Sequence, residues 1–168
     1  VARRSWRWLA AWAGLALVLA AGVASAFTAV ERNRVLAHGP WPPAPALDPG
    51  NAWAGRPDTV ALGQRLFFEP RLAPDARLAC ASCHLPSQAF ADGRARSHGR
   101  SVLDRNAPSL WNAVHQRWWG WDGAADSLWS QALRPLQDPR ELASNPAHLR
   151  QLLVGDAELA CRWRRSFG

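Results

Sequence analysis

Two cysteines and a histidine stand close together in the middle of the chain, in the order Cys80-Ala81-Ser82-Cys83-His84. Cys-x-x-Cys-His is the attachment pattern of c-type haem. Two thiols about one helical turn apart can reach the two vinyl groups on one edge of a porphyrin, and the adjacent imidazole can then coordinate the iron. The motif therefore predicts one covalent haem c, attached through Cys80 and Cys83, with His84 as an iron ligand.

Closely spaced cysteines also occur in zinc sites and in redox-active dithiols. A structural zinc site needs four ligands, and the remaining cysteine, Cys161, lies far away in the sequence. A redox dithiol follows a strand in a βαβ unit, and the sequence shows no such unit. Zinc, a redox dithiol and a chance match stay open as alternatives, and haem is the interpretation that the residues favour.

The composition narrows the class of haem protein. The chain contains no methionine, so it cannot itself supply the His/Met iron ligation of electron-carrier cytochromes. Its net charge is +7, and because no lysine is present, arginine supplies the positive charges. The arginines are scattered rather than gathered into a basic stripe, which argues against nucleic-acid binding.

A leader is expected at the N-terminus, over residues 1–30. Arginines precede an uncharged apolar run at residues 9–30, and Ala24-Ser25-Ala26 lies near its end. This is the pattern of a secretory signal cleaved after Ala26, but the run is also long enough for an uncleaved membrane anchor. Either alternative predicts a periplasmic protein, soluble after cleavage or tethered to the inner membrane.

A Pro-rich linker is expected over residues 31–57, extended over residues 38–57 where the prolines lie, and a folded domain is expected over residues 58–168. No segment alternates convincingly between apolar and polar residues, so the domain is predicted to be all-α. Helices are expected from Asp58 or Thr59 to just before Pro70, over residues 76–85, from Asp126, and from Asn145-Pro146 through Trp163. The long loop predicted over residues 86–108 suits a compact domain if it wraps a ligand such as haem.

Two longer blocks extend the motif: LGQRLFFEPRLAPDARLACASCHLPSQAFADGR and RNAPSLWNAVHQRWWGWDGAADSLWSQALRPLQDPREL. In this order and spacing they resemble the bacterial di-haem cytochrome c peroxidase family, which includes the maturation enzyme of methylamine dehydrogenase. The resemblance runs from Leu62 to the end of the sequence. It implies an all-α, cytochrome c-like haem domain.

Members of that family have two such domains, and this chain resembles only the N-terminal one, where hydrogen peroxide reacts. We therefore expect a truncated or partial copy, whose natural partner is the missing C-terminal haem domain. The resemblance implies a haem c-dependent peroxidase. It would reduce hydrogen peroxide to water with electrons from a small periplasmic donor, a cytochrome c or a cupredoxin.

The resemblance also assigns roles to individual residues. Glu141 and Gln131 match the glutamate and glutamine of the peroxide pocket. His98 stands where some members have a distal histidine that ligates the haem iron in the resting enzyme. Trp121 matches a tryptophan between the two haems, on the electron path, and Asn106 matches a ligand of an interface calcium.

Two other functions stay open. The chain could be a single-haem electron-transfer or haem-binding module without catalysis of its own. It could also belong to an enzyme that uses a high-valent haem to oxidise a protein substrate, as the maturation relative does.

Overall fold

The computed structural model describes residues 27–39, 42–45 and 48–168. The chain divides into two compact units at the bond between Pro43 and Ala44. Most of the expected leader over residues 1–30 lies outside the described residues. Within the described part of the chain, no helix has the length and apolar character needed to cross a membrane.

The described part of the first unit holds one helix, α2 (Ala29–Ala37). Its N-terminus is a capping box: the Thr28 hydroxyl accepts a hydrogen bond from the Glu31 amide at 3.2 Å, and the Glu31 carboxylate accepts one from the Thr28 amide at 2.8 Å. The Pro-rich linker predicted over residues 31–57 therefore begins within a helix, which covers its residues up to Ala37. The Thr-x-x-Glu spacing carried the missed signal.

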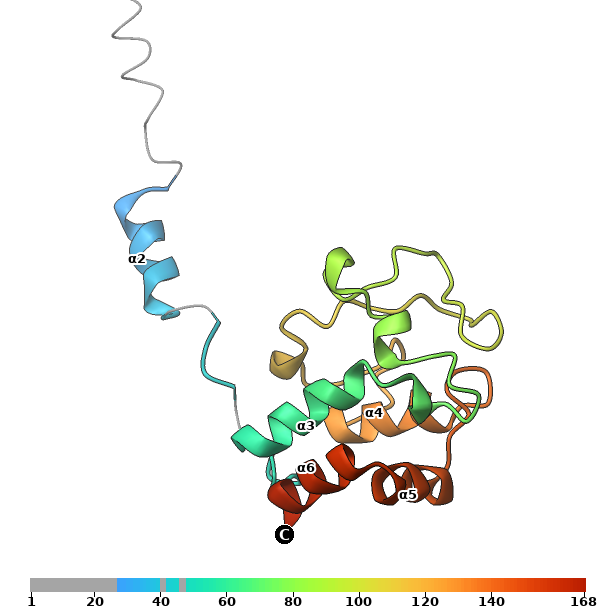
Figure 1. Ribbon diagram of the computed structural model, residues 1–168. Helices are drawn as coiled ribbons and strands as arrows, with labels where there is room; N and C mark the ends of the chain where they lie inside the picture. The colour runs from blue at the N-terminus through green and yellow to red at the C-terminus, as the bar shows by residue number, and fades with distance from the viewer. Residues whose placement is uncertain (1–26, 40–41, 46–47) are drawn as a thin grey trace, which may run out of the picture. The chain divides into compact units, whose positions relative to one another are not determined.

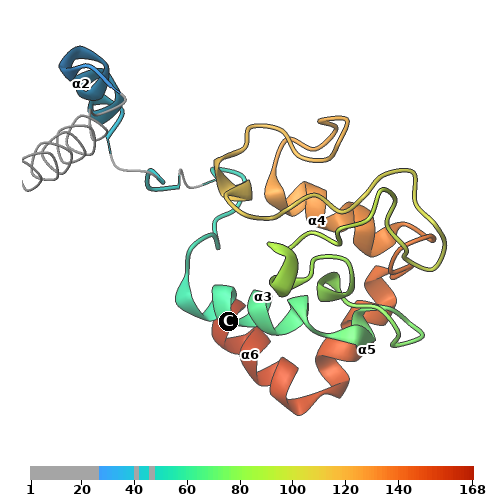
Figure 2. The same cartoon turned by 90° about the horizontal axis from the view of Figure 1, so that it is seen from above.

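The second unit is mostly helical (Figures 1 and 2). Its α-helices are α3 (Pro57–Phe67), α4 (Leu128–Gln137), α5 (Pro146–Gly155) and α6 (Ala157–Phe167). Short 3₁₀ turns lie between them: η1 (Pro70–Leu72), η2 (Cys80–Ser82), η3 (Pro86–Gln88) and η4 (Ala113–His115). No strand occurs among the described residues, where pairing is limited to isolated bridges. The predicted helical class is confirmed.

Three sequence expectations need correction. The helix expected over residues 76–85 is only the single turn η2. The last helix is broken at Asp156, whose carboxylate accepts the Leu159 amide at 3.0 Å and so caps α6 as a separate helix. The folded unit also begins before Pro57, because the Trp53 ring packs edge-on against Phe167 at 5.1 Å.

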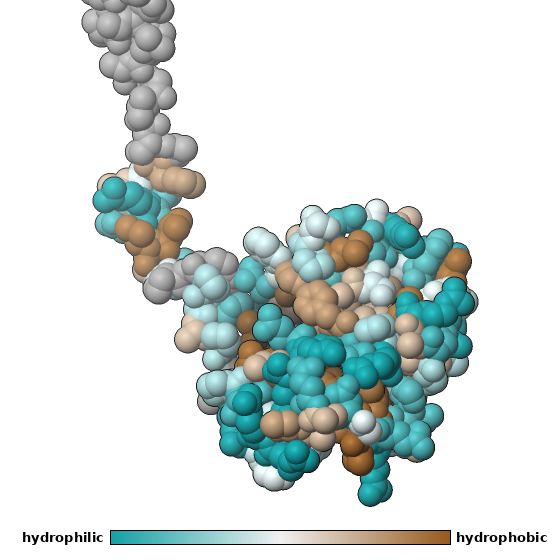
Figure 3. All heavy atoms as spheres, in the orientation of Figure 1, coloured by the Kyte–Doolittle hydropathy of each residue, from teal (hydrophilic) through white to brown (hydrophobic). Residues whose placement is uncertain are grey.

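The helices α3, α5 and α6 form one side of the second unit. α6 packs against both α3 and α5, and η1 packs against α5. One core cluster is formed by Leu72, Ala73 and Leu142, with partly buried leucines from α3, α4 and α5 packed against it. On the face shown in Figure 3, hydrophobic residues emerge in patches between hydrophilic ones.

A buried carboxylate ties these elements together. Glu69, whose side chain is 2% exposed, makes ion pairs with Arg65 at 2.8 Å and Arg71 at 2.7 Å. Arg71 reaches on to Asp156 at 2.9 Å, at the start of α6. The segment that leads into the cysteine motif is therefore anchored to the C-terminal helices.

Candidate haem site

The cysteine motif forms a tight turn rather than a longer helix. The Cys80 carbonyl accepts hydrogen bonds from the Cys83 amide at 3.2 Å and the His84 amide at 2.9 Å. Both thiols are free and partly buried. Burial raises the pKa of each thiol, and the negative charge of Glu141 adds to this effect. At neutral pH both sulfurs are therefore held as thiols.

The imidazole of His84 is oriented by the backbone. Its Nδ1 lies 2.9 Å from the Phe90 carbonyl oxygen. Because a carbonyl only accepts, Nδ1 carries the proton, and Nε2 is left with a lone pair that can bind a metal. Phe90 has a left-handed backbone, with φ 57°. This strained position is fixed by a bridge between Leu85 and Ala91, so the loop is folded back to meet the histidine.

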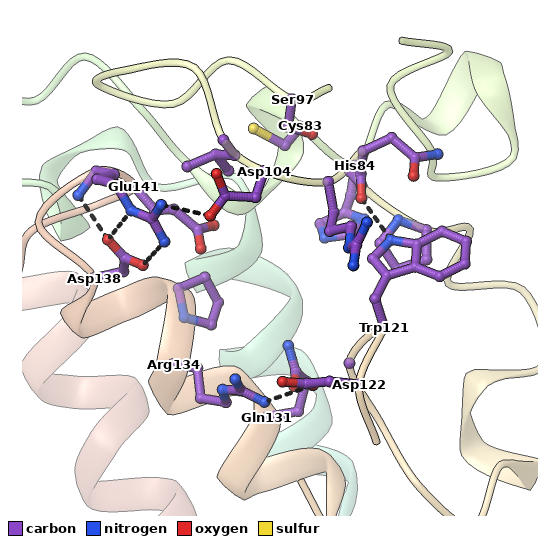
Figure 4. A pocket seen from close by; sticks show the side chains of 18 residues that line it. Cys83, His84, Ser97, Asp104, Trp121, Asp122, Gln131, Arg134, Asp138 and Glu141 are labelled. Atoms are coloured by element: carbon purple, nitrogen blue, oxygen red, sulfur yellow. Dashed lines mark hydrogen bonds and ion pairs between the residues drawn. The ribbon is translucent and has the colours of Figure 1, made fainter. Parts of the chain in front are cut away.

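A cavity of about 440 Å³ opens beside this turn, within the size range of ligand sites. Its walls come from the cysteine turn, the loop over residues 97–108, the turn at residues 120–122, α4 and the turn that follows α4 (Figure 4). The sequence-predicted residues that line it are Cys83, His84, Asn106, Trp121, Gln131 and Glu141. The structure thus brings most of the predicted site together.

Glu141 enters the cavity from the turn after α4, and a neighbouring loop holds that turn. The amide of Arg100 donates to the Arg140 carbonyl at 2.7 Å. A Cβ on Gly99 would lie 2.4 Å from the same carbonyl oxygen, so only glycine allows this close approach. Burial, followed by the nearby charge of Asp138, raises the pKa of Glu141. Its carboxyl group can therefore hold and release a proton nearer to neutral pH than an exposed glutamate.

Gln131 presents a buried oxygen that has no partner. Its Oε1 accepts no hydrogen bond in the structure, and burying an unpaired polar atom is costly. The turn at Gly120, with φ +80°, passes close by, and a Cβ there would lie 3.2 Å from that oxygen. The site thus offers an acceptor to a molecule bound in the cavity.

Trp121 and Asn106 meet at the cavity, but through the backbone of Asn106. The Trp121 indole Nε1 donates to the Asn106 carbonyl oxygen at 2.9 Å, while the Trp121 residue is 60% exposed. Among the described residues, no group of three or more His, Cys, Asp or Glu side chains could hold a metal ion. A calcium site that includes Asn106 stays a prediction.

His98 lies on the loop that walls the cavity, yet it is exposed and is not one of the residues that line the cavity. Its carbonyl oxygen lies 3.8 Å from the Cys83 sulfur, which donates to it. A role for the His98 imidazole as a distal ligand therefore stays a prediction. At this point the loop contacts the cysteine turn through its backbone carbonyl and not through the His98 imidazole.

Some functional positions escaped the sequence analysis. They are the Phe90 carbonyl, the close-packed Gly99 and Gly120, and the buried pair of Asp92 and Ser97. Gly99 gave a signal, because it falls in the loop predicted over residues 86–108 and follows His98. Gly120 precedes Trp121, in a segment for which no element was predicted. The carbonyl gave none, since any residue type supplies one.

The residues present fit a covalently bound haem. Two free thiols lie on one turn, the adjacent imidazole keeps a lone pair at Nε2, and the cavity beside them contains an unpaired acceptor. A zinc site has no support, because no fitting cluster of His, Cys, Asp or Glu occurs in the described part of the chain. Haem c is thus the group that this donor set favours.

Comparisons with known proteins point the same way. The family described as di-haem cytochrome c peroxidase matches residues 57–168. The chain is 38% identical over 114 residues to the methylamine utilization protein MauG of Methylorubrum extorquens, covering 67% of this chain and 32% of that protein. It is 37% identical over 108 residues to the cytochrome c551 peroxidase of Pseudomonas aeruginosa, and this match covers 63% of this chain and 31% of that protein.

Among solved structures, a MauG-like protein associated with microbial copper homeostasis shares the fold, with a TM-score of 0.66 and 32% identity. The match covers 74% of this chain and 37% of that one. The chain thus spans about a third of the length of the relatives it matches.

Proposed function

This chain belongs to the di-haem cytochrome c peroxidase family, and on that premise we propose that it forms the peroxide-reducing half of such an enzyme. In the proposed reaction, hydrogen peroxide takes up two electrons and two protons and gives two molecules of water. We place the reaction in the periplasm, with a cytochrome c or a cupredoxin as electron donor. The second haem would come from a C-terminal domain like that of the longer relatives.

One observation carries this proposal. The turn that bears Cys83 and His84 shares a single cavity with Gln131 and Glu141, although these residues are far apart in the sequence. Thiols and an imidazole can fix the haem on one side. An amide oxygen and a carboxyl group then stand ready for a small polar substrate on the other walls. An electron carrier needs the first set of groups and not the second.

Haem bound there would supply the iron at which the oxygen–oxygen bond of peroxide breaks and through which electrons arrive. Glu141 would handle the protons: its carboxylate takes one from the peroxide oxygen that binds and returns it to the oxygen that leaves. Its raised pKa suits both tasks, because the group is easily protonated and still able to give the proton up.

Gln131 would orient the substrate. Its Oε1 lacks a donor, and a peroxide or water O–H can satisfy it. The backbone hydrogen bond to Asn106 holds the indole of Trp121 at the cavity, where an aromatic ring can pass electrons toward a partner domain. His84 holds its proton on Nδ1, which keeps Nε2 available for the iron.

The test is Glu141→Gln in the haem-loaded protein, joined to its second domain where the coding sequence continues. Because general acid–base catalysis contributes roughly 10²–10⁴-fold, we expect the rate of reaction with peroxide to fall by about 10²-fold or more, with the haem spectrum nearly unchanged. Stopped-flow absorbance measures this rate. The matched control is Glu158→Gln, a half-exposed glutamate on α6, which should react like the unmodified protein.

Equal rates for Glu141→Gln and the unmodified protein would remove Glu141 from the mechanism. A haem-loaded protein that consumes no peroxide in the presence of a reduced donor would instead be an electron-transfer or haem-binding module. Peroxide consumption coupled to oxidation of a protein, and not of a small donor, would favour the activity of a maturation enzyme.

A further inference from the structure

Asp92 is a buried carboxylate that makes no ion pair with a basic side chain of the described residues. It is 7% exposed, and it takes part in none of the ion pairs found among the described residues. Glu69, the other buried carboxylate, is by contrast neutralised by Arg65 and Arg71. Nearby arginines therefore offset the negative charge of Glu69, whereas no ion-pair partner among the described residues offsets that of Asp92.

Neutral groups keep Asp92 charged. Its carboxylate accepts a short hydrogen bond from the Ser97 hydroxyl, one from the Arg94 amide at 3.2 Å, and one from the Ala107 amide. Burial alone would raise the pKa of Asp92, but these hydrogen bonds bring it below its usual range. The group therefore carries a negative charge at neutral pH, which hydrogen bonds stabilise and which no ion pair in the described part of the chain neutralises.

This charge lies directly behind the cavity wall. Ser97, its hydroxyl partner, is 1% exposed and lines the cavity together with Cys83 and His84. Asp92 also follows the segment whose Phe90 carbonyl holds the His84 imidazole.

We propose that Asp92 is a positioning residue which, anchored through Ser97, holds the cavity wall and lowers the reduction potential of the haem. This inference rests on the proposed attachment of haem at Cys80 and Cys83. A fixed negative charge in a weakly polar interior stabilises the more positive, oxidised state of a metal centre. Hydrogen-bonded groups behind the direct ligands tune metal sites in the same way.

The test is potentiometric titration of the haem-loaded protein with Asp92→Asn. This change removes the charge and keeps the size and much of the hydrogen bonding, so we expect the midpoint potential to move to a more positive value. Asp104→Asn is the matched control, because Asp104 also lines the cavity but its side chain is 72% exposed and pairs with Arg140. We expect a smaller shift there, since solvent screens that charge.

An unchanged or more negative potential in Asp92→Asn would overturn the inference, as would an equal shift in Asp104→Asn. If Asp92→Asn does not accumulate as a folded haem protein, Ser97→Ala takes its place. It keeps the charge and removes a dipole that offsets it, so the potential should become more negative, and an unchanged or more positive value would refute the inference.

Haem content, measured first by absorbance, separates two kinds of failure. An unmodified protein without covalent haem would refute the proposed function. A haem-loaded protein whose midpoint potential is unchanged by Asp92→Asn would refute only this further inference.

Discussion

Glu141 derives its chemistry from the groups around it. Burial and the charge of Asp138 raise its pKa, while Arg140 and Arg134 pull it down. Arg140 is itself held by Asp138 and Asp104 at 3.1 and 2.9 Å, so part of its field is cancelled. The carboxyl group is thereby left as a proton carrier rather than as half of an ion pair.

The position of Glu141 depends on Gly99, which leads to a prediction. In Gly99→Ala the new Cβ would meet the Arg140 carbonyl at 2.4 Å, and rigid backbone cannot yield without moving the turn. We expect a loss of stability of about 1–3 kcal/mol together with slower reaction with peroxide. Denaturant unfolding and stopped-flow absorbance measure the two effects.

The control for this change is Gly63→Ala. Gly63 lies within α3, and nothing stands within 4 Å of its added Cβ. Alanine is the better helix former by roughly 0.5–1 kcal/mol, so this variant should gain stability and react normally. Equal behaviour of the two variants would show that Gly99 does not position the turn.

Single residues differed in how far the sequence could reveal them. The motif alone predicts Cys80, Cys83 and His84 as haem-binding residues, because a reaction with porphyrin demands that spacing, and the structure places Cys83 and His84 at the cavity. The resemblance was needed for Gln131 and Glu141, whose types occur on any polar surface. The Phe90 carbonyl and the Asp92–Ser97 pair depend on how the loop folds, which a linear pattern does not encode.

At the level of elements, η1 is a junction between α3 and α6. Glu69 makes ion pairs with Arg65 of α3 and with Arg71 of η1. Arg71 also pairs with Asp156, the N-cap of α6. These ion pairs connect the segment before the cysteine turn with the C-terminal helices. The hydrogen bond between His148 Nε2 and the Arg71 carbonyl, at 2.8 Å, adds α5 to the junction. These ion pairs and this hydrogen bond anchor the segment before the cysteine turn from outside the cavity.

We expect the ion pairs of this junction to make the stability of the folded unit sensitive to acid. Hydrogen bonds from Arg71, against an opposing effect of burial, lower the pKa of Glu69 from 4.5 to about 2. A lowered pKa contributes stability that is fully present above pH 4.5 and lost as the pH falls through about 2. Glu69→Gln should therefore cost about 3 kcal/mol at neutral pH, and the difference from the unmodified protein should shrink toward pH 2.

Urea unfolding followed by circular dichroism across this pH range measures the loss. Glu158→Gln, whose ion pairs with Arg65 and Arg162 are partly exposed, should change stability by less than about 1 kcal/mol. A Glu69→Gln protein as stable as the unmodified one at neutral pH would contradict the role of the junction.

Helices were easier to predict than their ends. Asn145 and Pro146 correctly predicted the N-cap and the first residue of α5, because these signals are local. The N-cap predicted for α3 at Asp58 or Thr59 was wrong, because α3 already begins at Pro57, and its N-cap Arg56 makes no side-chain cap hydrogen bond. The break at Asp156 was missed, since the leucines continue across it with helical spacing. The early start of the folded unit was missed because the contact between Trp53 and Phe167 joins distant parts of the sequence.

At the level of the whole second unit, the structure is organised around its cavity. Five segments contribute walls, and the long loop over residues 86–108 has little regular structure of its own. A loop of this length is expected where it encloses a ligand. The core cluster of Leu72, Ala73 and Leu142 is small, and a covalently bound haem would add apolar surface around which these segments can pack.

Covalent haem attachment tests this account most directly. The protein is produced in a host that assembles c-type cytochromes, then analysed by mass and by absorbance after denaturation. We predict one covalently retained haem, lost in the double variant Cys80→Ala/Cys83→Ala and kept in Cys161→Ala, whose thiol is exposed. A colourless protein in which all three thiols remain free would contradict the account.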